Sequence, residues 1–489
     1  MARNTGQPWL VSRRYWLTGI GMAVGSGVLS LAVAACGSAS TVSPTAASTP
    51  KPTVNAAAAA PAAPTASSAA PAATAPAKAA LSGTFTTLGW GDIPYNQAML
   101  DDYAKAFPDK VGNLKFTAEG AKSETEVLTK VLTAFAAKSG VPDFFQQNAP
   151  TVPQLIDQGI VAPLDALINP NKDVFSSGLL AALSKDGHPY AFPWRPNTWM
   201  MFYRKDLLSN AGIDPTSLTT WDAYIAAGKQ YFSKTGGKSW LTYEPTNNGN
   251  GQPLEIFMDG LGISYVDPDG KPAAGNNPKM LQALESYQDF LTTKTAEARS
   301  EWDAPWYTAI KQGEFATMLS AVWLDNTLKG QAPELKGKWG IVPLPGYSAE
   351  KPTLGFQEGS PVLLVTTSSP FKDLAMDVMA YQYLTKDRVI AVAKQRIAQN
   401  KGAFPPLLTQ VLAEAPFNVP DDYYGGINFF KTNLDLSKNG VTIAFNLHFA
   451  ETLKTYNSHL DLISAGKETA QQAYDTIGKE LAGKLGPGG

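Results

Sequence analysis

The chain has 489 residues, a formal net charge of −2 at pH 7 and only 17% charged residues, which argues against a nucleic-acid-binding protein because phosphate contacts need a basic face. Cysteine occurs once, at Cys36, and histidine three times, so an internal disulfide and a cysteine-rich zinc site are excluded. Neither a metal nor a cofactor is expected.

The first 35 residues have the pattern of an export signal. Arg13 and Arg14 precede an apolar stretch over residues 19–35, and a basic head before a short hydrophobic run is typical of secretion signals. The arginine pair resembles the twin-arginine signal, although the general secretory route stays open. Residues 33–37 (VAACG) resemble a bacterial lipobox, which implies that Cys36 is lipidated and anchors the protein to the membrane. A plain transmembrane anchor is the alternative, but the apolar run is short for a span.

Residues 36–80 are predicted to be the lipidated cysteine followed by a disordered tether. Almost every position after Gly37 in this segment is Ala, Pro, Ser or Thr, and such a composition cannot bury a core. The pattern becomes globular at residue 81, so residues 81–489 are assigned to the folded domain, outside the cell membrane.

Strands and helices alternate along the first part of this domain. Predicted strands are Thr84–Trp90, Leu114–Glu119 and Asp143–Gln147, and predicted helices end near Phe107 or span about Val152–Gln158. Ser123 and Glu126 have capping-box spacing. One helical face then carries the apolar residues Val127, Leu128, Val131, Leu132 and Phe135. The alternation favours a parallel, doubly wound α/β sheet.

The same alternation returns later in the chain. The predicted strands are Trp199–Arg204, Lys238–Glu244, Ala316–Val322, Trp339–Leu344 and Pro361–Thr367, and the predicted helices are Trp221–Phe232, Pro278–Thr292 and Phe371–Thr385. About 400 residues exceed one compact core, so two lobes are expected. Because no Pro/Ser-rich linker separates them, we expect the chain to cross between the lobes more than once.

Six groups of residues carry a resemblance to a known family. In chain order they are VPDFF at 141–145, GIVAPL at 159–164, YAFP at 190–193 with MFYRKDL at 201–207, AGIDP at 211–215 with TWD at 220–222, DPDGKP at 267–272 and GEFATM at 313–318. Together they resemble the bacterial extracellular solute-binding proteins of family 1, the maltose-binding-like group that serves ABC importers. The resemblance covers residues 82–485.

This resemblance implies a two-lobed, class II periplasmic-binding-protein-like clamshell. Each lobe would be a mostly parallel sheet flanked by helices, with lobe 1 over about 81–195 and 347–395 and lobe 2 over about 196–346 and 396–489. Hinge crossovers would let the lobes close on a ligand. The implied partners are the transmembrane permease subunits of an ABC importer with their ATPase, and the protein itself is expected to be a monomer.

Candidate ligand contacts follow the predicted strands or lie in nearby loops, because ligands of open α/β sheets bind beyond the carboxyl ends of the strands. They combine aromatic rings with planar polar groups: Trp90, Asp92, Gln147, Asn148, Trp194, Arg195, Glu244, Trp302, Trp306, Trp323, Asp325 and Glu358. Sugars offer apolar C–H faces to aromatic rings and hydroxyls to polar groups. A carbohydrate is therefore the predicted ligand.

Several candidates have an alternative role. Asp92 could cap the following helix, Glu244 could lie at the surface, and Trp302 and Trp306 stand in a loop of mixed character. Glu358 departs from the small residues that the family usually has there. Four other tryptophans are assigned to the core (Trp199, Trp221, Trp240, Trp339), and three further aromatic residues could stack on sugar or pack (Phe404, Tyr423, Tyr424).

The segment Asp267–Gly270 is predicted to be a hairpin turn. Its aspartates resemble the start of a calcium loop, but the twelfth residue from Asp267 is Pro278 rather than a glutamate.

The predicted function is to capture an oligosaccharide between two lobes and deliver it to an importer, without catalysis. One alternative is a surface hydrolase that uses two of the candidate carboxylates. The sequence has no nucleophile elbow, phosphate loop or His-Glu-x-x-His motif, so no catalytic residue is assigned. The other alternative is the same fold with a polyol, a glycerol phosphate or, because of Arg195, another anionic solute.

Overall fold

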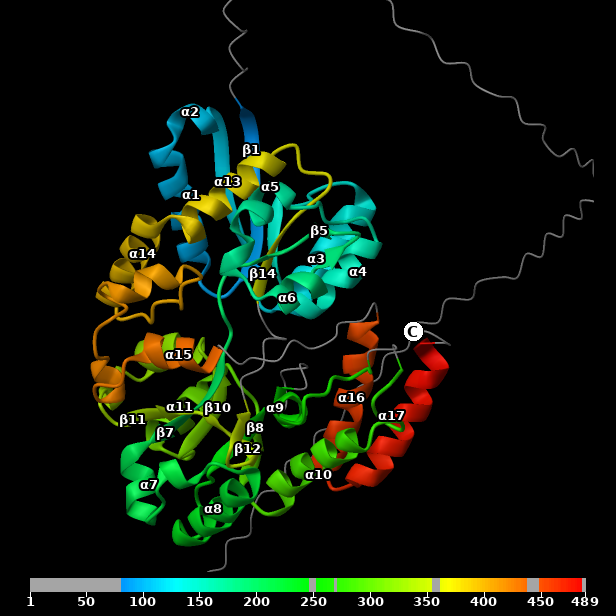
Figure 1. Ribbon diagram of the computed structural model, residues 1–489, viewed down its shortest axis with the longest axis vertical. Coiled ribbons are helices and arrows are strands. Elements are labelled where there is room, and N and C mark those ends of the chain that lie inside the picture. Colours follow the sequence, from blue (N-terminus) through cyan, green and yellow to red (C-terminus); the bar gives the residue numbers. More distant parts are fainter. Residues whose placement is uncertain (1–80, 246–251, 268–270, 354–360, 438–447, 486–489) are drawn as a thin grey trace, which may run out of the picture. The chain divides into compact units, whose positions relative to one another are not determined.

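Two main sheets organise the part of the chain that the computed structural model describes, residues 81–245, 252–267, 271–353, 361–437 and 448–485 (Figure 1). The five-stranded sheet has the order β2-β1-β3-β14-β6, and the three-stranded sheet has the order β10-β7-β11. The first comprises β1 (Ser82–Trp90), β2 (Asn113–Ala121), β3 (Phe144–Asn148), β6 (Phe192–Pro193) and β14 (Pro361–Val365). The second comprises β7 (Trp199–Arg204), β10 (Thr317–Ala321) and β11 (Trp339–Val342).

The five-stranded sheet is parallel only in part. β1 runs parallel to β2 and β3, as the strand–helix alternation predicts. β14 runs antiparallel to β3, and β6 runs antiparallel to β14. β14 follows the whole second sheet in the chain, so it joins the first sheet on a return path and not through a right-handed strand–helix–strand crossover.

The three-stranded sheet is antiparallel, because β7 pairs antiparallel with both β10 and β11. The prediction of a mostly parallel sheet in each lobe is therefore wrong for this one. The physical reason is that an apolar strand between helices has the same sequence pattern in either direction when both of its faces are buried.

Both central strands bury alternate side chains on opposite faces. In β14, Val362 and Leu364 belong to one hydrophobic cluster and Leu363 and Val365 to another. In β7, Trp199 and Met201 face one cluster while Met200 and Phe202 face a second. Since successive side chains of a strand point to opposite faces, a continuous apolar run places each sheet in the middle of its own core.

The first sheet is covered by α1 (Ile93–Ala106) and α13 (Lys372–Leu384) on one face and by α3 (Glu124–Ala137) and α4 (Val152–Asp157) on the other. The Ser123 hydroxyl caps α3 by accepting from the Glu126 N–H at 3.3 Å. The Glu126 carboxylate accepts from the Lys122 N–H at 2.8 Å, one residue before the position that a capping box predicts. Half of the predicted box is therefore formed as expected.

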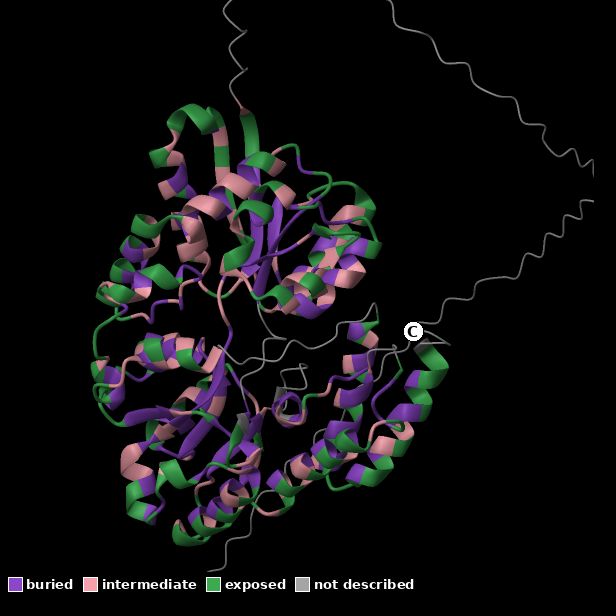
Figure 2. Cartoon of the chain, in the orientation of Figure 1, coloured by how far each residue is buried: buried purple, intermediate pink, exposed green. Residues whose placement is uncertain are grey.

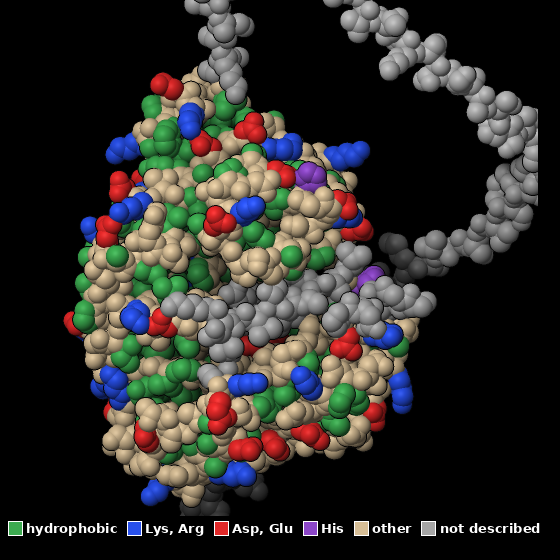
Figure 3. All heavy atoms as spheres, in the orientation of Figure 1, with side chains coloured by type: hydrophobic (Ala, Val, Ile, Leu, Met, Phe, Trp, Pro, Cys, Tyr) green, Lys and Arg blue, Asp and Glu red, His purple; other side chains and the backbone are tan. Residues whose placement is uncertain are grey.

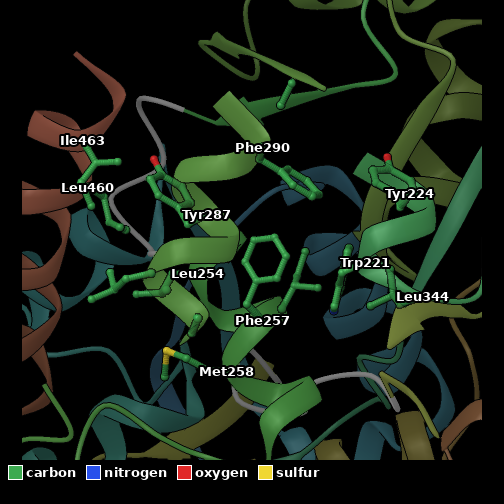
Figure 4. Packing of buried hydrophobic residues seen from close by; sticks show 14 of the residues in the cluster. Trp221, Tyr224, Leu254, Phe257, Met258, Tyr287, Phe290, Leu344, Leu460 and Ile463 are labelled. Atoms are coloured by element: carbon green, nitrogen blue, oxygen red, sulfur yellow. The ribbon is translucent and has the colours of Figure 1, made fainter. Parts of the chain in front are cut away.

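The second sheet packs against a larger set of helices. Its core includes α8 (Trp221–Lys234), α9 (Gln252–Leu261), α10 (Pro278–Thr292), α11 (Ala304–Gln312), α12 (Leu324–Gln331), α15 (Phe429–Ser437), α16 (Phe449–Ser464) and α17 (Ala470–Leu485). Figure 4 shows the aromatic centre of one cluster, where the ring of Phe257 lies 4.7 Å from that of Trp221 and 4.9 Å from that of Phe290. One face of α10 faces this core, with Met280, Leu284 and Tyr287 buried.

The remaining α-helices and strands of the described part of the chain are as follows. The helices are α2 (Pro108–Val111), α5 (Asp165–Ile168), α6 (Ser177–Ala182), α7 (Lys205–Ala211) and α14 (Lys386–Ala398). The strands are β4 (Ser184–Lys185), β5 (His188–Pro189), β8 (Thr242–Pro245), β9 (Ala296–Arg299), β12 (Leu344–Ser348) and β13 (Lys351–Thr353). Val266 and Pro272 form an antiparallel bridge on either side of the expected turn, whose residues 268–270 lie outside the described residues. Buried side chains follow the strands and the inner faces of the helices (Figure 2).

Candidate ligand-binding cavity

A cavity of about 1290 Å³ is lined by the ends of strands from both sheets and by the helices that follow them. From the first sheet come residues at the end of β1, the end of β3 and the start of α3, and from the connection between β6 and β7 come Trp194, Arg195 and Asn197. The loop before α11 and the start of α12 supply Trp302 and Trp323. This volume is above the range of about 300–1,000 Å³ that is typical of sites for small organic ligands, so the cavity has room for a ligand of several rings.

Eight of the twelve candidate residues line this cavity: Trp90, Asp92, Gln147, Asn148, Trp194, Arg195, Trp302 and Trp323. They come from segments far apart in the sequence, which the two sheets bring to one place. Most of the residues chosen because they follow strands or lie in nearby loops therefore line this cavity.

Asp92 combines its helix-capping role with two ion pairs. Its Oδ1 accepts from the Tyr95 N–H at 3.3 Å at the start of α1, and its Oδ2 lies 2.7 Å from Lys401 Nζ and 3.3 Å from Arg396 Nη1. Burial acts to raise the pKa of Asp92, but the hydrogen bond and charge of Lys401, together with Arg396, outweigh it and lower the pKa below its ordinary value. Asp92 is therefore ionised and joins the end of β1 to the segment after α14.

Gln147 is fully buried and hydrogen-bonded within the protein. Its Nε2 donates to the Glu124 carbonyl at 3.1 Å, and its Oε1 accepts from the Asn148 N–H at 2.8 Å. These bonds fix the start of α3 against the end of β3. Asn148 is only half-buried, and its side chain is the more accessible of the two amides.

Three tryptophans form a ladder at one side of the cavity. The ring of Trp302 lies 4.9 Å from that of Trp323 and 5.2 Å from that of Trp306. Trp302 is 47% exposed, Trp323 is half-buried and Trp306 is completely buried. Trp302 and Trp323 thus offer ring surface to the cavity, whereas Trp306 supports them from the core.

Four candidates do not line the main cavity. Trp306 belongs to the core, and the buried Asp325 is held at 2.8 Å by both Lys329 Nζ and the Tyr424 hydroxyl. Glu244 is buried beside a smaller cavity of about 20 Å³ and accepts from the Tyr287 hydroxyl at 2.7 Å. Glu358 lies outside the described residues. Residues that follow a strand can turn into the core, and the sequence pattern does not show which of them do so.

Buried glutamates next to the cavity pair with tyrosines. Glu301 accepts from the Tyr243 hydroxyl at 2.6 Å, and Glu255 accepts from the Tyr265 hydroxyl at 2.9 Å. Burial raises the pKa of Glu301 to about 7 and that of Glu255 to about 8. Both line the main cavity, so a fraction of these carboxyls is protonated near neutral pH and can donate a hydrogen bond as well as accept one.

The expectation that ligand contacts follow the strands did not identify the contribution of α16. One face of this helix lines the cavity through Ala450, Leu453, Lys454, Asn457, Ser458 and Asp461, while Tyr456, Leu460 and Ile463 on the other face are buried in the core. The spacing of three and four residues along 450–461 was a usable signal, because a polar stripe opposite an apolar one marks the exposed face of a helix. Trp199, which the sequence assigns to the core, is 4% exposed but also contributes to the lining.

A group of aromatic and cationic residues also lines the cavity, and of these only Phe404 was named from the sequence. The Arg396 guanidinium lies 4.1 Å above the Phe404 ring, and Tyr95 and Tyr383 line the cavity beside them. Tyr423 and Tyr424, which could have stacked on a sugar, are buried in the core. On the molecular face of Figure 3, acidic and basic side chains are interspersed without a patch of one sign.

A family model described as bacterial extracellular solute-binding protein matches residues 98–418. The chain belongs to this family. The lactose-binding protein of Rhizobium radiobacter is 27% identical over 71% of this chain and 80% of its own length. The arabinooligosaccharide-binding protein of Bacillus subtilis (strain 168) is 26% identical over 82% of this chain and 92% of its own length.

Solved structures of sugar-binding proteins share the fold. The ABC-transporter-associated binding protein of B. animalis subsp. lactis, in complex with β-1,6-galactobiose, has a TM-score of 0.67 at 21% identity and covers 82% of this chain and 97% of its own. The sugar-binding protein MalE of Xanthomonas citri has a TM-score of 0.65 at 19% identity, with the same coverage. The predicted α/β, two-lobed binding-protein fold and family are thus confirmed.

The family is one of extracellular binding proteins, so the chain is expected to act outside the cytoplasm. None of the helices in the described ranges is both long and apolar enough for a membrane span.

Proposed function

We propose that this solute-binding protein captures a carbohydrate, an oligosaccharide of a few units, in the cavity of about 1290 Å³ and hands it to an ABC importer. The observation that carries the proposal is the exposed ring of Trp302, which contacts the tilted ring of Trp323 at 4.9 Å, within a lining that is otherwise rich in amides, hydroxyls and carboxyls. Flat rings with polar groups around them suit the C–H faces and hydroxyls of a sugar. The named sugars of the two sequence relatives support the same class of ligand.

Uptake would follow from the two-lobed architecture. Lobe 1, about residues 81–195 and 347–395, and lobe 2, about 196–346 and 396–489, would close on a bound sugar. A ligand shifts this equilibrium only by its preference for the closed form. The closed monomer would then dock on the transmembrane permease, and the partner ATPase would drive opening and release.

The N-terminal segment would keep the protein at the cell surface. Residues 1–35 would be removed as a twin-arginine-type signal, Cys36 would carry the lipid, and the segment to residue 80 would act as a tether. A single substitution, Cys36→Ser, is expected to abolish incorporation of labelled fatty acid into the protein in the producing bacterium. Retention of the label would contradict lipidation at this residue.

The function is tested by thermal shift and calorimetry on the detergent-solubilised full-length protein. We expect an oligosaccharide from a panel of lactose, arabino-oligosaccharides, galactobiose and maltose to raise the melting temperature, because a ligand that binds only the folded state stabilises it. Chromatography of the recovered sugar should show it intact. Cleaved product would favour a surface hydrolase, and binding of mannitol or glycerol 3-phosphate alone would favour a non-sugar solute.

A further inference from the structure

Arg195 is a half-buried cation at the edge of the cavity. It lies in the connection between β6 and β7, and its guanidinium lies next to two aromatic rings, 4.8 Å from the centre of Trp194 and 5.3 Å from that of Phe404. Nε and Nη1 are shielded from solvent and have no hydrogen-bond partner in the structure. The side chain itself lines the main cavity, so a ligand there can reach it.

The other arginines of the described part of the chain are all paired with a carboxylate. Arg204 binds Asp206 at 2.7 Å, Arg299 binds Glu297 at 2.6 Å, Arg388 binds Asp102 at 2.7 Å and Arg396 binds Asp92 at 3.3 Å. Within those same ranges, Arg195 alone has no carboxylate within ion-pair distance. The lack of a carboxylate partner is therefore specific to Arg195 and is not shared by the other arginines of the described residues.

Shielding charged N–H groups from water without an acceptor is unfavourable. Desolvation opposes the charged form, and contact with aromatic rings offsets only part of that penalty. Burial lowers the pKa of Arg195 to about 10, which leaves the group charged at neutral pH. The neighbouring cation Arg396 adds to the need for a negative group, since its own charge is already matched by Asp92.

We propose that the captured carbohydrate is anionic and that its carboxylate or phosphate binds the Arg195 guanidinium. Hydroxyls of a neutral sugar could also accept from Nε and Nη1, but only a carboxylate or phosphate also neutralises the guanidinium charge. The neighbouring rings of Trp194 and Phe404 restrict the guanidinium, so little side-chain entropy is lost when the anion binds. This inference rests on the proposed capture of a carbohydrate and specifies its class.

The test compares neutral and anionic sugars on one protein. Matched pairs of neutral disaccharides and their uronic acid counterparts, in the gluco, galacto and manno series, are screened with sugar phosphates by thermal shift, and hits are measured by calorimetry. We expect an anionic member to bind about 10- to 100-fold more tightly than its neutral counterpart. Preference for a uronic acid identifies a carboxylate, and preference for a sugar phosphate identifies a phosphate.

Variants assign this preference to Arg195. Arg195→Met should weaken binding of the anionic sugar at least 10-fold more than binding of its neutral counterpart, and Arg195→Lys should keep part of the preference. Without ligand, Arg195→Met should melt no lower than the wild type, because an unpaired, half-buried cation is removed. Lys185→Met is the matched control, since Lys185 is exposed and pairs with Asp157 at 3.5 Å away from the cavity lining.

The outcomes separate this inference from the proposed function. A neutral sugar that binds as tightly as its anionic counterpart would overturn the inference and leave carbohydrate capture standing. A lower melting temperature of Arg195→Met, with equal loss for both sugars, would show a purely structural role and would also overturn it. Failure of every sugar in the panel to bind would overturn both.

Discussion

Trp302 shows how one residue can be held ready for a ligand. Its φ of 66° lies in the left-handed region, which side chains other than glycine rarely adopt, and its ring is 47% exposed. Such a conformation costs about 1–3 kcal/mol and persists only where the surroundings impose it. Here stacking on Trp323 and Trp306 opposes the strain and keeps the ring at the cavity.

Removing this ring tests its role. Trp302→Ala and Trp323→Ala are each expected to weaken sugar binding about 10-fold or more, because each loses the stacking surface, while the domain stays folded. Trp302→Gly should bind equally weakly but be at least as stable as Trp302→Ala, since glycine adopts positive φ without strain. Affinity is measured by calorimetry and stability by thermal melting.

Trp240 provides the control for these variants. It stacks on Phe232 at 5.7 Å and does not line the cavity. Trp240→Ala should therefore lower the melting temperature and leave the affinity unchanged. Unchanged affinity in Trp302→Ala and Trp323→Ala would remove these rings from the binding site.

At the scale of elements, α17 packs against the loop before α10 through a glycine. A Cβ on Gly478 would lie 2.6 Å from the Ala274 carbonyl oxygen and 2.8 Å from the Gly275 Cα. Both are backbone atoms, which cannot move aside as a flexible side chain can. The close approach of helix and loop therefore depends on the absence of a side chain at this position.

Two glycines of the same helix give a paired prediction. Alanine normally stabilises a helix by about 0.8–1.0 kcal/mol relative to glycine. Gly483→Ala should show this gain, because nothing lies within 4 Å of the added Cβ. Gly478→Ala should instead destabilise by about 1–3 kcal/mol, as overpacked positions do. Chemical denaturation measures both, and equal effects of the two substitutions would contradict the packing argument.

At the scale of the whole molecule, the buried glutamates make stability depend on pH. Burial raises the pKa of Glu301 to about 7 and that of Glu255 to about 8 from an ordinary value of 4.5, and that of Glu244 well above it. The folded protein thus binds these protons more tightly than the unfolded chain. Their contribution to stability is complete below pH 4.5 and is lost as the pH rises through about 7 to 8.

Thermal melting across pH checks this behaviour. We expect the melting temperature of the protein without ligand to fall between pH 5 and pH 8.5. Glu301→Gln keeps an acceptor for the Tyr243 hydroxyl and cannot ionise, so it should reduce this fall and raise the melting temperature at pH 8.5. Glu350→Gln, at an exposed position, is the control and should leave the profile unchanged. A melting temperature that rises from pH 5 to pH 8.5 would contradict the argument.

Local patterns were enough to find most elements and much of the cavity. The strand Trp199–Arg204 and the helix Pro278–Thr292 have the predicted bounds, because a continuous apolar run and helical periodicity are both properties of neighbouring residues. Trp90, Asn148 and Arg195 were identified because residues after strands tend to meet at one edge of a sheet.

Three features became clear only in the tertiary structure. They are the direction of the strands, whether single side chains turn toward the cavity or the core, and the contribution of α16 to the cavity lining. The antiparallel course of β7 and β14 depends on the return path between the sheets, which leaves no local signal. Asp325 turns toward Lys329 and Tyr424, and α16 brings Asn457 and Asp461 to the cavity, through contacts between residues far apart in the sequence. The sequence by itself determined most element types and the family and predicted an export signal, because these are properties of short segments and their order. The unpaired state of Arg195 emerged only in the structure, since it depends on which carboxylates the fold brings within reach.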